Sequence, residues 1–271
     1  MATVTFPAQE VLQRRSLARM IAIYVKESKY ELLKNARIPV YAISTIAFPL
    51  MFYVLFGIVL SHNNPAARDN ASYMLATMGC FGVMAVALFG FGVSLAMERG
   101  QGWLQMKRAS PMPVGAYFFA KLFAAVVFST VIILLLLTVG FAFGGVHIPL
   151  GTAAKLLGIL VAGSIPFSAM GLAIGYFAKP NSAPAVVNLI YLPMAFCSGL
   201  WIPLFMLPHG LQAFAKVLPP YHMSQMALNT LGMGMSPTSA WGHVESLVAF
   251  TMICLGLAAW GYHRDEGKTY G

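Results

Sequence analysis

Six long apolar stretches dominate this chain and limit how it can fold. A helix needs roughly 20 apolar residues to cross a hydrocarbon core about 30 Å thick. The six stretches are residues 39–60, 71–97, 114–143, 152–178, 183–204 and 244–262. Overall the chain is 59% hydrophobic and only 9% charged, whereas soluble domains carry about 25% charged residues. The sequence therefore predicts an all-α membrane protein whose residues 39–271 form one domain with six transmembrane helices.

The distribution of lysine and arginine predicts the orientation of these helices. If the N-terminus is cytoplasmic, all of the 17 basic side chains fall on the inner side except Arg68, Lys155 and Lys216. Loops rich in lysine and arginine stay in the cytoplasm. Both termini are therefore expected there. The formal net charge of +9 is then a signal for topology and for anionic lipids, and no nucleic-acid partner is expected.

The N-terminal tail, residues 1–38, is expected to contain an amphipathic helix. At 100° per residue, one face carries Leu17, Met20, Ile21, Tyr24, Ser28 and Leu32, and the opposite face carries Arg15, Arg19 and Lys26. Such a helix can lie in the cytoplasmic interface of the membrane, with its basic side chains toward lipid phosphates. The alternative is a solvated helix that packs on a partner protein.

Sequence motifs for catalysis or metal binding are absent. The tail Gly267-Lys268-Thr269 resembles the end of a nucleotide-binding P-loop, but Tyr262 stands where that motif needs glycine. The chain has no HExxH or CxxC motif, and its outer histidines lack the spacing of metal ligands. These histidines are His62, His147, His209, His222 and His243. We therefore expect no catalytic site, no metal site and no cofactor on this chain.

Ionisable residues are nearly absent from the predicted spans. Glu245 and Lys121 lie close to span ends, where a long side chain is expected to reach the polar interface. A carrier driven by protons or ions is therefore disfavoured. Pro49, Pro166 and Pro193 lie within spans and predict kinks or breaks.

The segment 98–113, between the second and third spans, is predicted to form a cytoplasmic coupling helix that docks on another protein. An apolar ridge of Trp103, Leu104 and Met106 lies between basic residues, and prolines end the segment. An exposed apolar ridge with arginine is typical of a docking surface. The residues proposed for this contact are Glu98, Arg99, Gly102, Trp103, Leu104, Lys107, Arg108 and Pro111. A short helix lying on lipid is the alternative.

The segment 202–242, before the last span, predicts short helices at the outer leaflet. It contains several prolines together with the apolar runs 211–218 and 223–231. These runs are too short to cross a membrane and too apolar for a solvated loop. Re-entrant or interfacial helices fit them best.

These segments, in this order, resemble the permease subunit of ABC-2 type exporters. The motif Glu98-Arg99-x-x-Gly102-x-Leu104 continues to Arg108-Ala109-Ser110-Pro111. Further on come Gly199-Leu200-Trp201-Ile202-Pro203 and Leu218-Pro219-Pro220-Tyr221. Gly100 and Gln101 stand where many members of the family carry acidic residues, which leaves open the charges that meet the partner.

The resemblance implies a transporter of several chains in the bacterial cytoplasmic membrane. Two permease chains, identical or different, pair with each other, and two copies of a separate ABC ATPase bind ATP and Mg²⁺ beneath them. Spans two and five face the transport pathway, which points to Phe81, Met84, Leu88, Asn188, Tyr191 and Phe196.

The expected cargo is an amphiphilic drug, an antibiotic or a lipid-like molecule that is moved out of the cytoplasm or the inner leaflet. Polysaccharide, glycolipid and sodium export are alternatives within the same family. A membrane scaffold or assembly subunit without a transport role is the alternative outside it.

Overall fold

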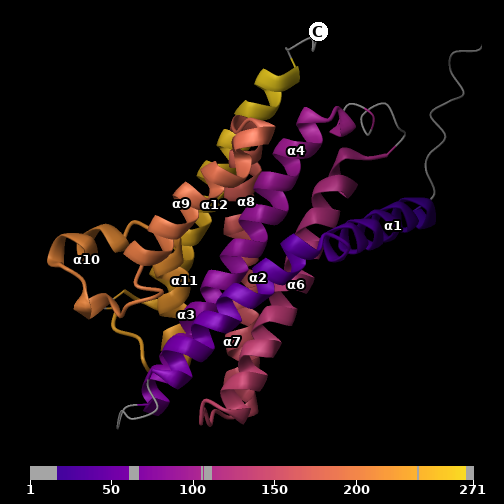
Figure 1. The fold of residues 1–271 in the computed structure, drawn as a ribbon. Helices are drawn as coiled ribbons and strands as arrows, with labels where there is room; N and C mark the ends of the chain where they lie inside the picture. Colours follow the sequence, from indigo (N-terminus) through magenta and orange to yellow (C-terminus); the bar gives the residue numbers. More distant parts are fainter. Residues whose placement is uncertain (1–16, 61–66, 105, 107–111, 237, 267–271) are drawn as a thin grey trace, which may run out of the picture.

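The computed structural model describes residues 17–60, 67–104, 106, 112–236 and 238–266, and these residues form helices and loops without a β-strand. In chain order the elements are α1 (Leu17–Ala36), α2 (Pro39–Phe52), the π-helix η1 (Tyr53–Val59), α3 (Ala67–Ala87), the π-helix η2 (Leu88–Val93), α4 (Ser94–Gly100), α6 (Val114–Ala142), α7 (Leu150–Ala162), α8 (Ser164–Phe177), the 3₁₀ turn η3 (Pro180–Ser182), α9 (Ala183–Cys197), the 3₁₀ turn η4 (Leu204–Met206), α10 (His209–Ala215), α11 (Pro219–Thr230) and α12 (Ala240–Glu266). Figure 1 shows most of them in an elongated bundle.

Five helical segments are long and apolar enough to cross a membrane, and they confirm five of the predicted spans. They are Tyr41–Val59, Asp69–Gly100, Val114–Ala142, Leu150–Phe177 and Ala240–Arg264. The second segment joins α3, η2 and α4 into one continuous rod in the centre of the bundle. Of the residues in its most apolar part, 78% are buried.

The remaining predicted span, residues 183–204, contains a shorter helix than expected. α9 has 15 residues, which at about 1.5 Å per residue gives a length of roughly 22 Å. Gly199 has a φ of 79° and turns the chain shortly after the helix ends, because glycine adopts positive φ without a steric penalty. Six complete spans therefore remain a prediction.

Two of the three predicted breaks, at Pro49 and Pro166, coincide with irregular backbone, whereas Pro193 lies inside α9 without an interruption of the helix. Pro49 lies inside α2, and the helix changes to the π-helix η1 four residues later. The fourth predicted span divides at Gly163 into α7 and α8, with Pro166 in the first turn of α8. In the second span η2 is also a π-helix and contains Gly90 and Gly92. π-turns within α-helices are frequent at functional sites.

Glycines allow the central rod to lie unusually close to α8. A Cβ atom on Gly171 would lie 2.9 Å from the carbonyl oxygen of Ala87 and 3.2 Å from the nitrogen of Gly92. Gly175 faces the Gly92 carbonyl oxygen at 3.1 Å in the same way. Small residues four apart let membrane helices approach closely. This contact fixes η2 and α4 against the rest of the bundle.

The N-terminal helix α1 leaves the bundle at a wide angle to the spans, as Figure 1 shows. Its buried residues are Ser28, Glu31 and Asn35, whereas the apolar side chains of Leu17 and Ile21 are exposed. The face that contacts the bundle is therefore mixed, because Tyr24 and Leu32 pack against the bundle beside these polar residues. In the segment 202–242 the chain forms η4, α10 and α11, and α10 protrudes from the side of the bundle (Figure 1).

Candidate functional site

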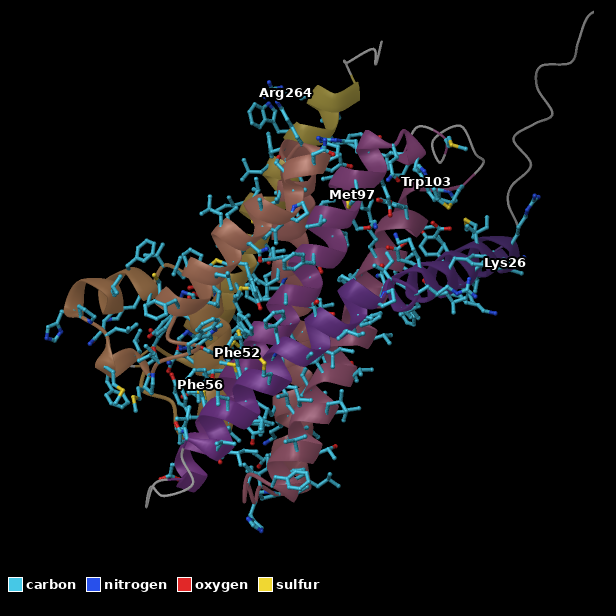
Figure 2. The ribbon with its side chains drawn as sticks, in the orientation of Figure 1. Lys26, Phe52, Phe56, Met97, Trp103 and Arg264 are labelled. Carbon is cyan, nitrogen blue, oxygen red and sulfur yellow. The ribbon has the colours of Figure 1, made fainter. Side chains whose placement is uncertain are left out.

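A cavity of about 960 Å³ lies between α2, the central rod and α9. One end is formed by Met97 and Trp103 at the end of α4, and the other by Phe52 and Trp201. Figure 2 shows Met97 and Trp103 at the end of the bundle near Arg264, with Phe52 farther along. The cavity therefore runs lengthwise along the bundle, over much of the second span.

The inner wall of the cavity is aromatic. Phe81 and Tyr191 stack with ring centroids 4.7 Å apart, and the Tyr191 hydroxyl donates to the Phe81 carbonyl at 3.1 Å. Phe52 packs on Trp201 at 4.7 Å between centroids. The full set of aromatic lining residues is Tyr41, Phe48, Phe52, Phe81, Phe89, Trp103, Tyr191 and Trp201. Such a wall can bind a large apolar or ring-containing molecule.

The end of the cavity near Met97 and Trp103 is polar. Lys34 and Asn35 of α1, with Ser94 and Glu98 of α4 and Gln101 just beyond it, line this end. These groups offer both hydrogen-bond donors and acceptors. The cavity as a whole thus has a half rich in aromatic rings and a half that holds the charged side chains.

Behind the polar end lies a buried cluster of two lysines and two glutamates. The Lys121 ammonium on α6 is 2.9 Å from Glu31 of α1 and 3.1 Å from Glu98 of α4. The Lys34 ammonium lies 2.7 Å from Glu31 and 2.5 Å from Glu98. We call these four side chains the charge cluster. It joins three helices that are far apart in the sequence.

Two neutral side chains complete the hydrogen bonds of the charge cluster. The Ser94 hydroxyl accepts from Lys121 at 2.7 Å, and the Tyr117 hydroxyl donates to Glu98 at 2.6 Å. The Lys121 side chain is only 1% exposed. Because buried charges are costly unless they are paired and hydrogen-bonded, the opposite charges and these hydroxyls offset the cost of burying the cluster.

Lys34 is the member of the charge cluster that also reaches the cavity surface. Burial alone would lower its pKa, but the carboxylates of Glu98 and Glu31 outweigh burial and raise the pKa above its ordinary value. Lys34 is therefore charged at neutral pH. Its charge is balanced by these carboxylates, so the polar end of the cavity is close to electrically neutral.

Comparison with known proteins identifies the family of this chain. Residues 28–231 match the family model described as "ABC-2 type transporter". The chain is also 30% identical over 260 residues to the "Putative transport permease YvfS" of Bacillus subtilis strain 168, an alignment that covers 94% of this chain and 98% of that protein. The chain belongs to the ABC-2 type transporter family. It is a membrane permease of that family.

The residues predicted for the coupling contact of this permease divide into inward-facing and outward-facing groups. Trp103 is 53% exposed and lies beside the cavity opening. Leu104 is only 9% exposed and packs with Leu95, Tyr117 and Tyr176. Leu104 therefore does not contribute to an exposed apolar ridge, contrary to the expectation from the sequence. Gly102 has a φ of 75°, which suits the turn after α4.

The two charged residues at the start of the coupling segment are engaged within the permease. Glu98 belongs to the charge cluster, and the Arg99 guanidinium donates to the carbonyl oxygens of Tyr176 and Ala178 at the end of α8. Arg99 therefore satisfies carbonyls at a helix end that would otherwise lack donors. Lys107, Arg108 and Pro111 lie outside the described residues.

The predicted pathway residues also divide into two groups. Phe81, Asn188 and Tyr191 line the cavity. Met84 and Leu88 are fully buried in the core, and the cavity lining does not include them or Phe196. The aromatic residues of α2, which the sequence analysis did not single out, form the facing wall.

For the interfacial helix, Arg19 and Lys26 are exposed on α1, and Figure 2 shows Lys26 on the part of α1 that projects from the bundle. Tyr24 packs edge-on against Phe119 of α6 with centroids 5.4 Å apart, so it anchors the helix. Arg15 lies outside the described residues.

Sequence reasoning missed the charge cluster. The expectation that Lys121 reaches a polar interface is wrong, since its ammonium is buried among carboxylates. One available signal was the pair of opposite charges, Glu98 and Lys121, at the facing ends of two apolar spans. Another was the Glu31–Lys34 pair, which lies three residues apart on a helix predicted to bind lipid.

Proposed function

We propose that this permease is the membrane subunit of an ATP-driven exporter whose energy comes from a separate ABC ATPase. The cavity would hold the cargo, and α1 with the segment 98–113 would transmit the movement of the ATPase. In the proposed assembly two permease chains pair in the bacterial cytoplasmic membrane, with both termini on the ATPase side, and ATP and Mg²⁺ bind to the two ATPase subunits.

One observation carries this proposal: Lys34, Ser94 and Glu98 belong both to the polar end of the cavity and to the contacts that fix α1. A displacement of α1 or α4 therefore has to change the shape and the charges of the cavity. Since a partner can shift a conformational equilibrium only by binding one state better than the other, the ATPase needs a contact that moves with the cavity. The exposed Trp103 supplies one.

The cavity favours an amphiphilic cargo over the other cargo classes of the family. Its wall is rich in aromatic rings, and its charged side chains, Lys34 and Glu98, lie at one end. A polysaccharide would leave most of its hydroxyl groups without partners along such a wall. A sodium ion needs several oxygen ligands, whereas the cavity lining offers one carboxylate, that of Glu98, which is paired with Lys34 and Lys121. A drug-like or lipid-like molecule fits both halves.

The test uses the permease reconstituted in proteoliposomes, alone and with its cognate ABC ATPase. Uphill export of a fluorescent amphiphile is expected only with the ATPase and ATP. Trp103→Asp should reduce permease-stimulated ATP hydrolysis to the basal level while the permease still inserts. The control Trp241→Asp changes another exposed tryptophan, at the start of α12, and should keep normal stimulation.

Three results would contradict the proposal. Uphill transport by the permease alone would mean that no ATPase is needed. Normal stimulation of the ATPase in Trp103→Asp would remove this contact from the coupling path. Copurification of a membrane enzyme complex in place of an ATPase would favour the scaffold alternative.

A further inference from the structure

Two buried histidines join α11 to the start of α12, away from the residues that line the cavity. Nδ1 of His222 lies 2.9 Å from Nδ1 of His243, and the ring centroids are 5.2 Å apart. His243 is 0% exposed and His222 is 8% exposed. The ring of Tyr221 contacts both imidazoles. The two histidines thus form a direct hydrogen bond between two helices in a nearly dry environment.

The neighbouring groups determine which nitrogen carries each proton. The backbone of Lys216 favours the protonated form of the His222 ring, so we assign the ring N–H of neutral His222 to the nitrogen on that side. A neutral imidazole has one donor and one acceptor. In this assignment His222 accepts at Nδ1 and His243 donates from Nδ1. Nε2 of His243 then carries a lone pair, and this buried atom has no hydrogen-bond partner in the described part of the chain.

A second proton has no favourable place in this pair. On His222 it must bind to Nδ1, and two N–H groups would then face each other across 2.9 Å. On His243 it must bind to Nε2, which is buried without an acceptor. Burial lowers the pKa of His222, and the backbone of Lys216 only partly opposes this effect. The folded contact is therefore the form with two neutral rings.

The other titratable groups near the pair do not offset an added charge. On α11 the neighbour is the neutral Tyr221, and on α3 the Cys80 thiol bonds to the Pro220 carbonyl. Lys155 of α7, Lys216 and Glu245 of α12 are exposed. Within the described residues no carboxylate forms an ion pair with either imidazole. An added proton would thus place an uncompensated charge in the helix contact.

We infer that His222 and His243 form a proton-sensitive contact that holds α11 against α12 at neutral pH and releases it in acid. This inference goes beyond the transport function and does not depend on it. If the termini are cytoplasmic, the contact lies toward the outer side of the membrane, where an acidic medium would loosen the end of the permease from which a cargo leaves.

Hydrogen–deuterium exchange on the full-length protein in nanodiscs tests this inference. Protection of residues 219–230 is compared at pH about 7.5 and about 5.5, after correction for intrinsic exchange rates. When the helices separate, each imidazole binds a proton with the ordinary histidine pKa of 6.5, whereas the closed contact does not bind the added proton. Protection should therefore fall about tenfold for each histidine that titrates in this way.

The matched variant is His243→Asn, because an asparagine amide stands close to the position of Nδ1. Its NH₂ group can donate to neutral His222, and after a flip its oxygen can accept from protonated His222. The contact should therefore persist at both pH values. The protection of residues 219–230 should change less than about twofold, because the closed contact then accepts the proton on His222 as readily as the open form does. As a control, His209→Gln removes an exposed histidine at the start of α10 and should behave like the wild type.

Three results would overturn the inference. One is equal acid-dependent loss of protection in the wild type and in His243→Asn. Another is unchanged protection of residues 219–230 in the wild type, a result that decides the question even if the variant does not fold. The third is protection by excess Zn²⁺ at neutral pH that disappears in His243→Asn, which would make the pair a metal site.

Discussion

Lys121 of α6 lies 2.9 Å from Glu31 of α1, and the two side chains are 1% and 5% exposed. An ion pair that is normally expected at a solvated surface is thus buried between a membrane-spanning helix and a helix outside the spans. Glu98 of α4 lies 3.1 Å from the same ammonium. The charge cluster therefore makes α1 an integral part of the bundle, although α1 is mostly exposed to lipid or water along its first half.

Lys121→Met is predicted to destabilise the permease strongly. The substitution keeps the volume of the side chain but leaves two buried carboxylates with Lys34 as their one cation among the described residues, and breaking a buried pair in this way costs about 3–5 kcal/mol. Unfolding in mixed micelles with increasing SDS measures the loss. Lys155→Met is the control, because Lys155 is exposed on α7, and its effect should stay within about 0.5 kcal/mol.

The same experiment can show whether Lys121 and Glu31 act as a pair. In the double variant Lys121→Met/Glu31→Gln, one of the two carboxylates that lost the Lys121 cation is also neutralised. The loss of stability should therefore be smaller than the sum of the two single losses, by roughly 0.5–3 kcal/mol. Additive losses would contradict a direct interaction between these two side chains.

Gly171→Ala is predicted to destabilise the contact between α8 and the central rod. The new Cβ would meet the Ala87 carbonyl oxygen at 2.9 Å, and backbone atoms cannot move aside as a flexible side chain can. Gly158→Ala is the matched control, since a Cβ at Gly158 of α7 meets nothing within 4 Å. That control should be neutral or stabilising by up to about 1 kcal/mol, the difference in helix propensity. A stabilising effect of Gly171→Ala would show that the two helices are not in close contact.

The spans could be predicted from the sequence because their signal is local. Twenty apolar residues in a row have few other solutions in a membrane, and five of the six predicted spans are confirmed. The remaining predicted span, residues 183–204, differs because Gly199 allows the chain to turn. A single glycine in an apolar stretch does not reveal whether the helix continues through it.

The candidate site was harder to predict because it depends on which helices are neighbours. The partners of Glu98 are 64, 23 and 19 residues away in the sequence, at Lys34, Lys121 and Tyr117. The local sequence pattern predicted that Leu104 belongs to an exposed ridge. In the structure Leu104 is buried among residues of α4, α6 and α8. Trp103, one residue earlier, remains exposed, and only the direction of the chain after Gly102 separates the two.

Arg99→Gln distinguishes a structural role from a docking role for this arginine. Since the guanidinium donates to two carbonyls at the end of α8, we expect a loss of stability of about 1.5–3 kcal/mol, the usual value for a hydrogen bond with a charged group. Stimulation of the ATPase per folded permease should then remain close to normal. Unchanged stability together with lost stimulation would instead make Arg99 a contact to the ATPase.

Ala85→Phe is predicted to block cargo binding without unfolding the permease. Ala85 lies on α3 and its small side chain borders the cavity next to the aromatic wall, so a phenyl ring in its place has open space to enter and removes volume that the cargo needs. Binding of a fluorescent amphiphile to the purified permease should weaken by at least about tenfold, which corresponds to roughly 1.4 kcal/mol.

The control for the cavity experiment is Ala154→Phe, which adds the same ring at an exposed position on α7. Both variants should unfold at similar SDS concentrations, and only Ala85→Phe should lose the amphiphile. If Ala85→Phe bound the amphiphile as tightly as the control does, the cargo would have to bind elsewhere, and the shared residues Lys34, Ser94 and Glu98 would no longer link the charge cluster to transport. Because binding is measured without an ATPase, this result would test the cavity separately from the coupling contact at Trp103.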